Sequence, residues 1–241
     1  MKNQSRVLSL SQFRTYLKCP RLFSYGGEVK AVPEIEIIEA IFERISSLYL
    51  KNEHYDLNSL YNDSVVILNR YSKKEQLLQS QYNKLLNTVI VFTSEIFKHF
   101  NIFQMYPIYG PILLNQKISK SVVKLKSSGV FRGVNQTIHL VVFSPYKNRL
   151  NVLNDPTVHF LNEAFRDFVK AHKTNRPKVI INIFYYKNDK ELGHIKWVPP
   201  KNTRNYDSVL IGYENNSFNP IVPCNYSCKY KTKCEKNNYD I

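Results

Sequence analysis

Cysteine is the residue type whose spacing in this sequence points most clearly to chemistry. The 241-residue chain has four cysteines, and three of them lie close together near its C-terminal end in the pattern C-x3-C-x5-C. The fourth lies far upstream, in the run Tyr-Leu-Lys-Cys-Pro. Four thiolates are a ligand set for a [4Fe–4S] cluster and for structural zinc. The sequence therefore predicts a metal centre held by Cys19, Cys224, Cys228 and Cys234.

The identity of that centre follows from the spacing and from the expected compartment. Structural zinc usually takes its thiolates from two paired C-x2–4-C knuckles, whereas Cys19 stands alone. A [4Fe–4S] cluster commonly uses a close group of cysteines plus a remote one, so it is favoured over zinc. Residues 1–6 lack the apolar core of a secretory signal, so we expect an intracellular, reducing setting. Zinc, and free or paired thiols, remain the alternatives.

A centre of this kind would join the first helix to the last loop. Loop-closure entropy rises only slowly with loop length, so a link across most of the chain still restricts the unfolded state. Metal binding of this type is coupled to folding. We therefore expect the metal centre to act as a clasp for the domain.

The charge balance indicates an acidic partner. The chain has 34 Lys and Arg against 19 Asp and Glu, a net charge of +15, together with 17 Tyr and 14 Phe. Lysine and arginine side chains contact phosphates, and aromatic rings stack on bases. DNA is therefore the expected partner. An AT-rich genome would explain some of the lysines but not the shortage of acids. No run approaches eighteen apolar residues, so no membrane span is expected.

The loop between the clustered cysteines is itself basic and aromatic. Positive charge beside cysteines favours thiolates and also phosphate contact. We therefore expect DNA contacts in this loop, with a solvated tail as the alternative. The residues concerned are Lys229, Lys231, Lys233, Tyr226 and Tyr230.

The N-terminal part of the chain is predicted to be mainly helical. Ser9 and Gln12 form a capping-box pattern, and Pro33 lies near the start of a second apolar helical repeat. Ser72 and Glu75 form another capping-box pattern, which predicts the start of the longest helix. We expect helices over residues 9–17, 31–50 and 72–100, with an irregular connection or short helices over 52–63.

The pattern changes after Pro107, Gly110 and Pro111, which interrupt helical periodicity. Strands are expected over 113–125, 130–143, 150–153, 179–186 and 193–198, and a helix over 155–173 that begins at Asp155-Pro156. The predicted fold class is α/β, with a mixed β-sheet flanked by helices. We expect a single domain over 1–241, with a helical part over about 1–105, a sheet core over about 112–200 and a C-terminal segment over about 201–241.

Both ends of the chain resemble one family. The run Ser9–Tyr25 is similar to the entry motif of RecB-type PD-(D/E)XK nucleases that carry an iron–sulfur cluster, a group that includes AddB-like and CRISPR-associated exonucleases. The segment from Phe218 onward is similar to the family's closing motif, which usually reads C-x2-C-x5-C, one residue shorter at the first gap. The resemblance implies a restriction-endonuclease-like core and a [4Fe–4S] cluster at the four cysteines.

The resemblance also says where catalytic carboxylates should lie. These nucleases hydrolyse phosphodiesters with divalent cations that need oxygen ligands. Where the family has G-x-x-D, this chain reads Gly133-Val-Asn135-Gln136, with the amide Gln136 in place of the acid. The D/E-x-K motif aligns either with Pro145-Tyr-Lys147, which keeps only Lys147, or with Asn154-Asp155-Pro156, which loses the lysine. We prefer the second, because it preserves a strand–turn–strand.

Other family positions are altered as well. The Q-x-x-x-Y motif corresponds to residues 161–165, which read Leu-Asn-Glu-Ala-Phe, and Glu39 stands near the usual early histidine and is expected to face solvent. Asp155 is read as a helix cap rather than as a displaced catalytic acid. His139 and His159 could ligate a metal, but ordinary structural roles are the better interpretation.

These residues predict a catalytically inactive, nuclease-like iron–sulfur protein. We expect it to bind DNA or to serve as a subunit of a DNA-processing or transcription assembly, and its composition is compatible with a bacteriophage or mobile-element origin. One alternative is an active metal-dependent exonuclease with relocated acids, for which Asp155 and Glu163 are candidates. A second alternative is a protein-binding module whose basic surface meets an acidic partner.

Overall fold

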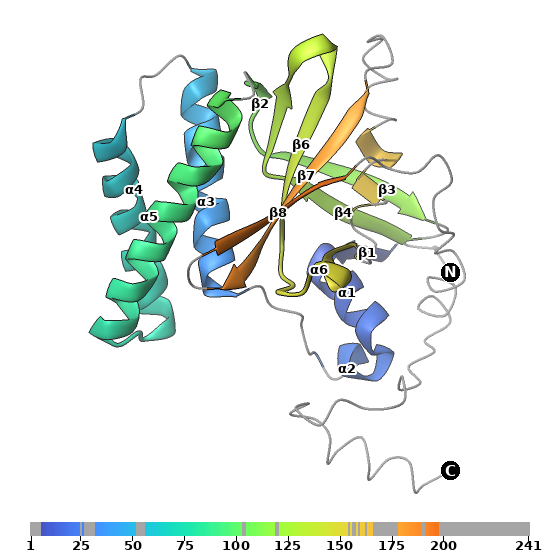
Figure 1. Ribbon diagram of the computed structural model, residues 1–241. Coiled ribbons are helices and arrows are strands. Elements are labelled where there is room, and N and C mark those ends of the chain that lie inside the picture. The colour runs from blue at the N-terminus through green and yellow to red at the C-terminus, as the bar shows by residue number, and fades with distance from the viewer. Residues whose placement is uncertain are drawn as a thin grey trace, which may run out of the picture. The chain divides into compact units, whose positions relative to one another are not determined.

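The computed structural model describes most of the chain before residue 198 (Figure 1). The described residues are 6–24, 26, 32–51, 56–102, 105–118, 121–153, 155, 158, 160, 161, 163–165, 178–188 and 191–197. The chain divides into two compact units. The first comprises Met1–Lys30, Asn115–Leu125 and Asn202–Ile241, and the second Ala31–Leu114 and Lys126–Lys201. The prediction of one nuclease-like domain stays a prediction.

The first unit contains two short helices and most of a three-stranded sheet. Helix α1 (Leu10–Lys18) leads into α2 (Pro20–Ser24). The sheet has the order β1-β4-β3, where β1 is Arg6–Ser9, β3 is Ile112–Ile118 and β4 is Ser121–Ser127, and β1 pairs with β4 in parallel. The Oγ of Ser9 accepts from the Gln12 amide at 3.2 Å, and Gln12 Oε1 accepts from the Ser9 amide at 2.9 Å. The predicted capping box at the start of α1 is therefore confirmed.

The second unit combines three long helices with a five-stranded mixed sheet. The helices are α3 (Pro33–Leu50), α4 (Leu57–Glu75) and α5 (Gln79–Ile102). The strands, in the sheet order β2-β5-β6-β7-β8, are β2 (Tyr106–Tyr109), β5 (Gly129–Arg132), β6 (Ile138–Ser144), β7 (Val179–Asn188) and β8 (Glu191–Trp197). Within the described part of this sheet, β6–β7 is the one parallel pair, and the other three pairs are antiparallel. The predicted α/β fold class is confirmed, with two mixed sheets rather than one.

The core of the second unit lies where α3 packs on the sheet. Phe42, on α3, is fully buried, and its ring lies 5.5 Å from Phe97, 5.8 Å from Phe131 and 5.6 Å from Phe143, measured between centroids. These rings belong to a larger apolar cluster that joins α3, α4 and α5 to strands β5, β6 and β7. Burial of apolar area on this scale is the main force that holds helices against a sheet.

The longest helix, predicted over 72–100, is present as α5, but its predicted start was wrong, and so was the connection predicted over 52–63. The run Ser72–Glu75 does not begin a helix but ends α4: Gln76 has a φ of 54°, and its amide donates to the Ser72 carbonyl. A left-handed residue after the last turn is a common way to end a helix. The connection predicted over 52–63 is helical from Leu57, where the Asp56 side chain accepts from the Ser59 amide at 2.7 Å. Residues 52–55 lie outside the described part of the chain.

The strand predictions were right in the hairpin and wrong in the middle. The predicted hairpin is present as β7 and β8, paired from Ile181↔Trp197 to Asn188↔Glu191. The single strand predicted over 130–143 is two strands, β5 and β6, joined by the short 3-10 turn Val134–Gln136. The strand predicted over 113–125 is likewise two strands, β3 and β4. The strand predicted over 150–153 is wrong, because Arg149–Leu153 forms helix α6.

The predicted helix after Asp155 is present where the structure describes it. Val158, Phe160, Leu161 and residues 163–165 are helical, and the Val158 amide donates to the Asp155 carbonyl at 3.2 Å. Among the described residues, no helix is long and apolar enough to span a membrane.

Candidate functional site

Cys19 lies at the corner between α1 and α2. Its amide donates to the Thr15 carbonyl at 2.9 Å, and its carbonyl accepts from the Phe23 amide at 3.1 Å. The rings of Tyr16 and Phe23 pack edge to face at 5.8 Å across the corner. Cys19 is half-buried and forms no disulfide with another described residue. A half-buried thiol held on a braced corner suits a ligand of a structural metal centre.

The other predicted ligands and contacts lie outside the described residues. This applies to Cys224, Cys228 and Cys234, and to the basic and aromatic residues of the same loop: Lys229, Lys231, Lys233, Tyr226 and Tyr230. Asn154, Pro156 and His159 also fall outside the described residues. Within the described ranges, no three or more His, Cys, Asp or Glu side chains come together as metal ligands would. The predicted cluster and its DNA contacts stay predictions.

The run aligned with the first nuclease carboxylate forms the turn between β5 and β6. Strand pairing brings Arg132 opposite Ile138, and Asn135 between them has a φ of 58°. Asparagine tolerates this left-handed conformation better than most residues. A side chain at Gly133 would place its Cβ 2.7 Å from His139 Nε2, so a larger residue there would force the buried His139 side chain to move. Tight packing and turn geometry thus account for the glycine and the asparagine of this run.

The lysine of the first alignment lies three residues after the end of β6. Lys147 is exposed, and its Nζ lies 5.0 Å from the centre of the Tyr186 ring. Our preference for the second alignment rested on a strand over 150–153, and that segment is the helix α6. Asp155, in the second alignment, is 3% exposed. The reason for preferring the second alignment is therefore gone, and the assignment of either one stays a prediction.

Two carboxylates and a lysine come together beside the start of β5. Glu39 and Glu43 lie one turn apart on α3, and Lys126 Nζ is 2.5 Å from Glu43 Oε1 and 3.8 Å from Glu39 Oε1. Ser128 Oγ donates to Glu39 Oε1 at 2.6 Å. Glu39 therefore faces Lys126 and Ser128, and the prediction that it faces solvent was wrong. We call these four residues the Glu–Lys cluster.

In the Glu–Lys cluster, two carboxylates share one lysine. Burial raises the pKa of Glu43, and the hydrogen bond from Lys126 offsets only part of that rise. Burial lowers the pKa of Lys126, but the negative charges of Glu39 and Glu43 outweigh burial and leave the pKa above its usual value. Lys126 is thus held in its charged form between the two acids. Apart from the ion pair with Lys126, no described donor bonds Glu43 Oε1.

A second polar assembly crosses β6, β7 and β8. Asn182 is fully buried, and its Nδ2 donates to His139 Nδ1 at 3.1 Å, while its Oδ1 accepts from His194 Nε2 at 3.2 Å. His139 Nε2 then carries the proton and donates to Thr137 Oγ1 at 3.0 Å, which in turn donates to the Val134 carbonyl at 2.9 Å. Both nitrogens of His139 are thereby bonded to protein atoms, which favours a structural role.

Exposed basic residues gather at one end of the five-stranded sheet. Arg132 ends β5, Lys178 immediately precedes β7, and Lys196 lies next to the last residue of β8. Strand register places Arg132 level with Ile138 and Val179, next to Lys178, and Tyr106 of β2 pairs with Arg132. Lys196 pairs with Asn182, three residues further along β7, in the half of β8 nearer to this end. All three are exposed, and none forms an ion pair with another described residue. We call Arg132, Lys178, Lys196 and Tyr106 the basic sheet end.

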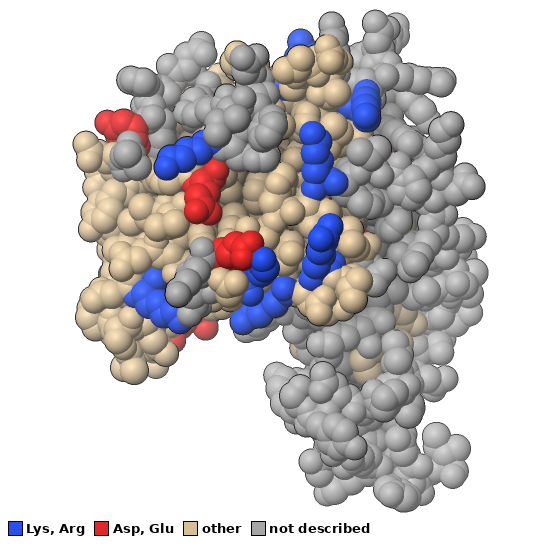
Figure 2. Space-filling model, viewed as in Figure 1, with Lys and Arg blue, Asp and Glu red and all other residues tan. Residues whose placement is uncertain are grey.

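The surface as drawn shows the same contrast between paired and unpaired charge. On the face in Figure 2, some Lys and Arg side chains lie directly beside Asp or Glu side chains, whereas others stand apart from any acidic side chain in the described part. Unpaired cations raise the local potential and attract anions.

No protein-family model matches the sequence, and no curated protein is significantly similar to it. The resemblance to RecB-type nucleases therefore stays a prediction, and function has to be argued from the geometry. Sequence reasoning noticed Glu39 and His139 singly but missed their partners Glu43, Lys126 and Asn182. The spacing of Glu39 and Glu43, one helical turn apart, was a visible signal, whereas their pairing with Lys126 depends on tertiary contact.

Proposed function

We propose that this protein binds DNA through a basic surface that includes the basic sheet end, without cleaving it. The observation that carries the proposal is the set of three exposed cations, Arg132, Lys178 and Lys196, none of which has an acidic partner in the described part of the chain. Cations of this kind release counterions from DNA when they meet its phosphates, and this release drives binding.

The use of acidic residues elsewhere supports the proposal. Glu39 and Glu43 pair with Lys126, Asp63 pairs with Arg44, and Glu191 pairs with Lys187. These acids therefore pair with other cations and do not neutralise the basic sheet end. Tyr106, which is 67% exposed beside Arg132, offers a ring on which an unpaired base can stack.

The proposal includes a [4Fe–4S] cluster at Cys19, Cys224, Cys228 and Cys234, with zinc as the alternative. When bound, the cluster would link the N-terminal corner to the C-terminal loop and so stabilise the fold. Protein purified without oxygen should contain about four iron atoms per chain. Stoichiometric zinc without iron would overturn this part of the proposal. Cys19→Ser should lower the iron content and the stability together, whereas wild-type behaviour would exclude Cys19 as a ligand.

The DNA-binding proposal is tested by the salt dependence of affinity. Each phosphate that is neutralised contributes about −0.9 to the slope of log affinity against log salt on duplex DNA. Replacing Arg132, Lys178 and Lys196 together by Gln should therefore flatten the slope by about two to three units. The matched control replaces Lys73, Lys84 and Lys98 of α4 and α5 by Gln, and should leave the slope unchanged. Equal effects of the two triple variants would contradict a specific surface.

The predicted contacts in the C-terminal loop need a separate variant. Replacing Lys229, Lys231 and Lys233 by Gln should also flatten the slope while leaving the iron content intact. If this triple variant alone changes the slope, the DNA surface is the loop and not the basic sheet end. Absence of DNA binding by the wild type at low salt would remove the proposal altogether.

A second candidate, metal-dependent hydrolysis of DNA, is favoured by the Glu–Lys cluster. Two carboxylates and a lysine are the residue types that such hydrolysis uses to hold a cation and to stabilise charge. Its test is cleavage of single- and double-stranded DNA with magnesium or manganese. We expect no turnover. Cleavage that Glu43→Gln abolishes would show that catalytic acids had moved to α3, and cleavage that Asp155→Ala or Glu163→Gln abolishes would place them at those acids instead.

A further inference from the structure

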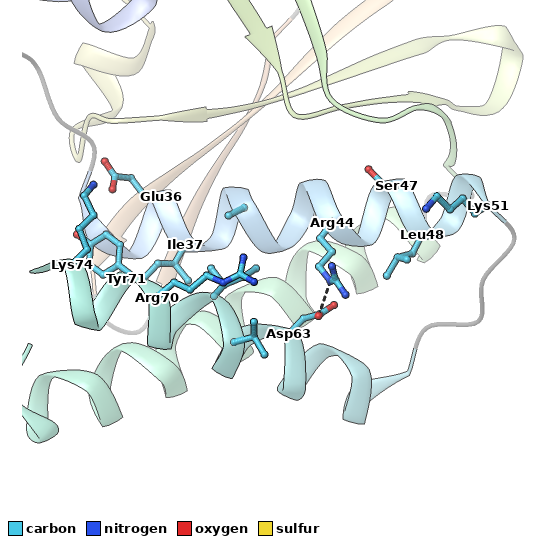
Figure 3. Close-up of a pocket in the computed structure, with 13 residues that line it drawn as sticks. Glu36, Ile37, Arg44, Ser47, Leu48, Lys51, Asp63, Arg70, Tyr71 and Lys74 are labelled. Carbon is cyan, nitrogen blue, oxygen red and sulfur yellow. Dashed lines mark ion pairs between the residues drawn. The ribbon is translucent and has the colours of Figure 1, made fainter.

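A groove runs along the surface between α3 and α4 (Figure 3). Its volume is about 780 Å³, and its floor is apolar where Ile37 and Ala40 of α3 meet Val66 and Ile67 of α4. Ala40 and Ser47 are the small residues on the α3 side of the groove. Val66 is 47% exposed although it lies in this apolar floor. The described residues of the unit therefore leave this apolar floor partly uncovered.

The rim of the groove carries more positive than negative charge. Four cations, Arg44, Lys51, Arg70 and Lys74, face two acids, Glu36 and Asp63. Arg44 Nε is 2.6 Å from Asp63 Oδ1, so this pair is neutral as a unit. Lys51 and Arg70 form no ion pair with a described residue.

Lys74 Nζ lies 3.7 Å from Glu75 Oε1, so the cations without a described acidic partner, Lys51 and Arg70, stand at one end of the groove and nearer its middle. Figure 3 shows Arg70 extended along the groove from α4 toward Arg44, and Lys51 at the other end of α3. Cations that line an apolar floor favour an occupant with apolar side chains flanked by carboxylates.

The length of the groove fits a helix. The α3 residues that line it run from Glu36 to Lys51, a distance of about 22 Å at 1.5 Å per residue. An amphipathic helix of about 15 residues would span it and would place apolar side chains at positions i, i+3, i+4 and i+7 on the floor. A nucleic acid would leave the apolar floor unfilled, whereas the apolar stripe of an amphipathic helix would cover it.

We propose that this groove binds an amphipathic helix of a partner protein whose apolar stripe is flanked by Asp or Glu. The apolar stripe covers Ala40, Ile67 and Val66, and the acidic flanks pair with Lys51 and Arg70. This proposal does not rest on DNA binding or on the metal centre, because none of its residues belongs to the basic sheet end or to the cysteines.

The test uses two synthetic helical peptides of about 16 residues. Both carry Leu at i, i+3, i+4 and i+7, and they differ only in whether Glu or Lys flanks that stripe. Fluorescence anisotropy of the labelled peptides with the full-length protein should show binding of the Glu peptide and little binding of the Lys peptide. Equal binding of the two peptides, or no binding of either, would overturn the proposal.

Charge reversal and groove filling locate the binding. The double variant Lys51→Glu/Arg70→Glu should weaken the Glu peptide about tenfold or more and should strengthen the Lys peptide. Ala40→Phe should block the Glu peptide by filling the floor while leaving every charge in place. Lys98→Glu, on α5, is the control for charge alone and should change neither peptide.

Two outcomes separate this groove from other surfaces. If Ala40→Phe leaves the Glu peptide unaffected although the variant is folded, the peptide binds elsewhere and the proposal fails. If duplex DNA displaces the Glu peptide and the Lys51→Glu/Arg70→Glu variant loses DNA binding, the groove is a nucleic-acid surface instead. Loss of DNA binding on changing Arg132, Lys178 and Lys196, with the peptide still bound, would leave both proposals standing.

Discussion

The Glu–Lys cluster and the basic sheet end belong to the same unit but treat charge in opposite ways. In the Glu–Lys cluster, Lys126 lies between two carboxylates, and the cluster is partly withdrawn from solvent. At the basic sheet end, Arg132, Lys178 and Lys196 are exposed and have no acidic partner among the described residues. The first arrangement holds α3 against the start of β5, whereas the second holds nothing together.

This difference separates residues that stabilise the fold from residues that are available for binding. A charge that is partly buried destabilises the fold strongly when it loses its partner, whereas an exposed charge does not. Exposed cations on one surface also repel one another slightly. Their presence without acidic partners therefore points to an external anion. Variants in the Glu–Lys cluster should therefore change stability and leave DNA binding unchanged, and variants at the basic sheet end should do the reverse.

The largest effect should come from the apolar contact beneath the Glu–Lys cluster. Phe42, which lies between Glu39 and Glu43 on α3, is fully buried against three aromatic rings. Phe42→Ala removes these contacts and leaves a cavity, so we expect a loss of about 3–5 kcal/mol in the free energy of unfolding. Urea denaturation followed by circular dichroism measures it. Phe42→Leu, which keeps most of the volume, should cost clearly less; equal costs would show that the site relaxes around any change.

An intermediate effect should follow from removing the lysine of the cluster. Lys126→Met leaves Glu39 and Glu43 facing each other without a cation, and should cost about 1–2 kcal/mol at neutral pH after allowance for its partial exposure. Its DNA affinity should match that of the wild type. A loss of DNA affinity without a loss of stability would reverse the roles assigned to the two regions.

The pH dependence of that cost has a definite sign. Burial raises the pKa of Glu43 in the folded state above its reference value of 4.5. The folded protein therefore holds this proton more tightly than the unfolded chain, and the stability it contributes is lost as the pH rises from 4.5 through the folded-state pKa. Removal of Lys126 raises this pKa further. The cost of Lys126→Met should thus be small near the reference pKa and should grow toward neutral pH; a cost independent of pH would contradict the pairing.

In the wild type, Lys126 also makes the free energy of unfolding depend on pH in the alkaline range. Its pKa is raised in the folded state, mainly because the charges of Glu39 and Glu43 outweigh the effect of burial. The stabilisation it supplies is complete below its reference pKa of 10.5 and is lost as the pH rises through the folded-state value. Lys126→Met should lack this alkaline loss.

Local sequence signals predicted some elements of this fold well and misplaced others. The capping box at Ser9 and Gln12 and the hairpin of β7 and β8 were predicted correctly, because each depends on residues close together in sequence. The related S-x-x-E pattern at Ser72–Glu75 was misleading. The capping box requires an extended residue at the helix cap, and Ser72 instead lies in the last turn of α4. Composition cannot show which conformation a serine takes.

The candidate site was less predictable than the fold for the same reason. The turn at Gly133–Gln136 was read as a decayed catalytic motif, and its glycine is explained by the approach of His139, a residue on the neighbouring strand. The Glu–Lys cluster likewise joins residues about ninety positions apart, since Ser128 bonds Glu39 across a sequence separation of 89. Such pairings depend on strand register and helix docking, which local patterns do not contain.

The smallest effect should come from an ion pair whose two side chains are exposed. It tests whether the pairing of opposite charges, without burial, is enough to stabilise the fold. Lys187 Nζ lies 2.7 Å from Glu191 Oε2 across the β7–β8 turn, and the two side chains are 48% and 56% exposed. Water screens such a pair, and holding two flexible side chains costs entropy, so its coupling energy should be only about 0.2–1 kcal/mol. A double-mutant cycle with Lys187→Ala and Glu191→Ala measures this energy, and added salt should reduce it.

A coupling as large as the cost of Lys126→Met would mean that charge matching stabilises this fold regardless of burial. A small, salt-sensitive coupling would instead show that partial burial makes the Glu–Lys cluster structural, and that exposed charges at either end of the sheet are free to serve binding.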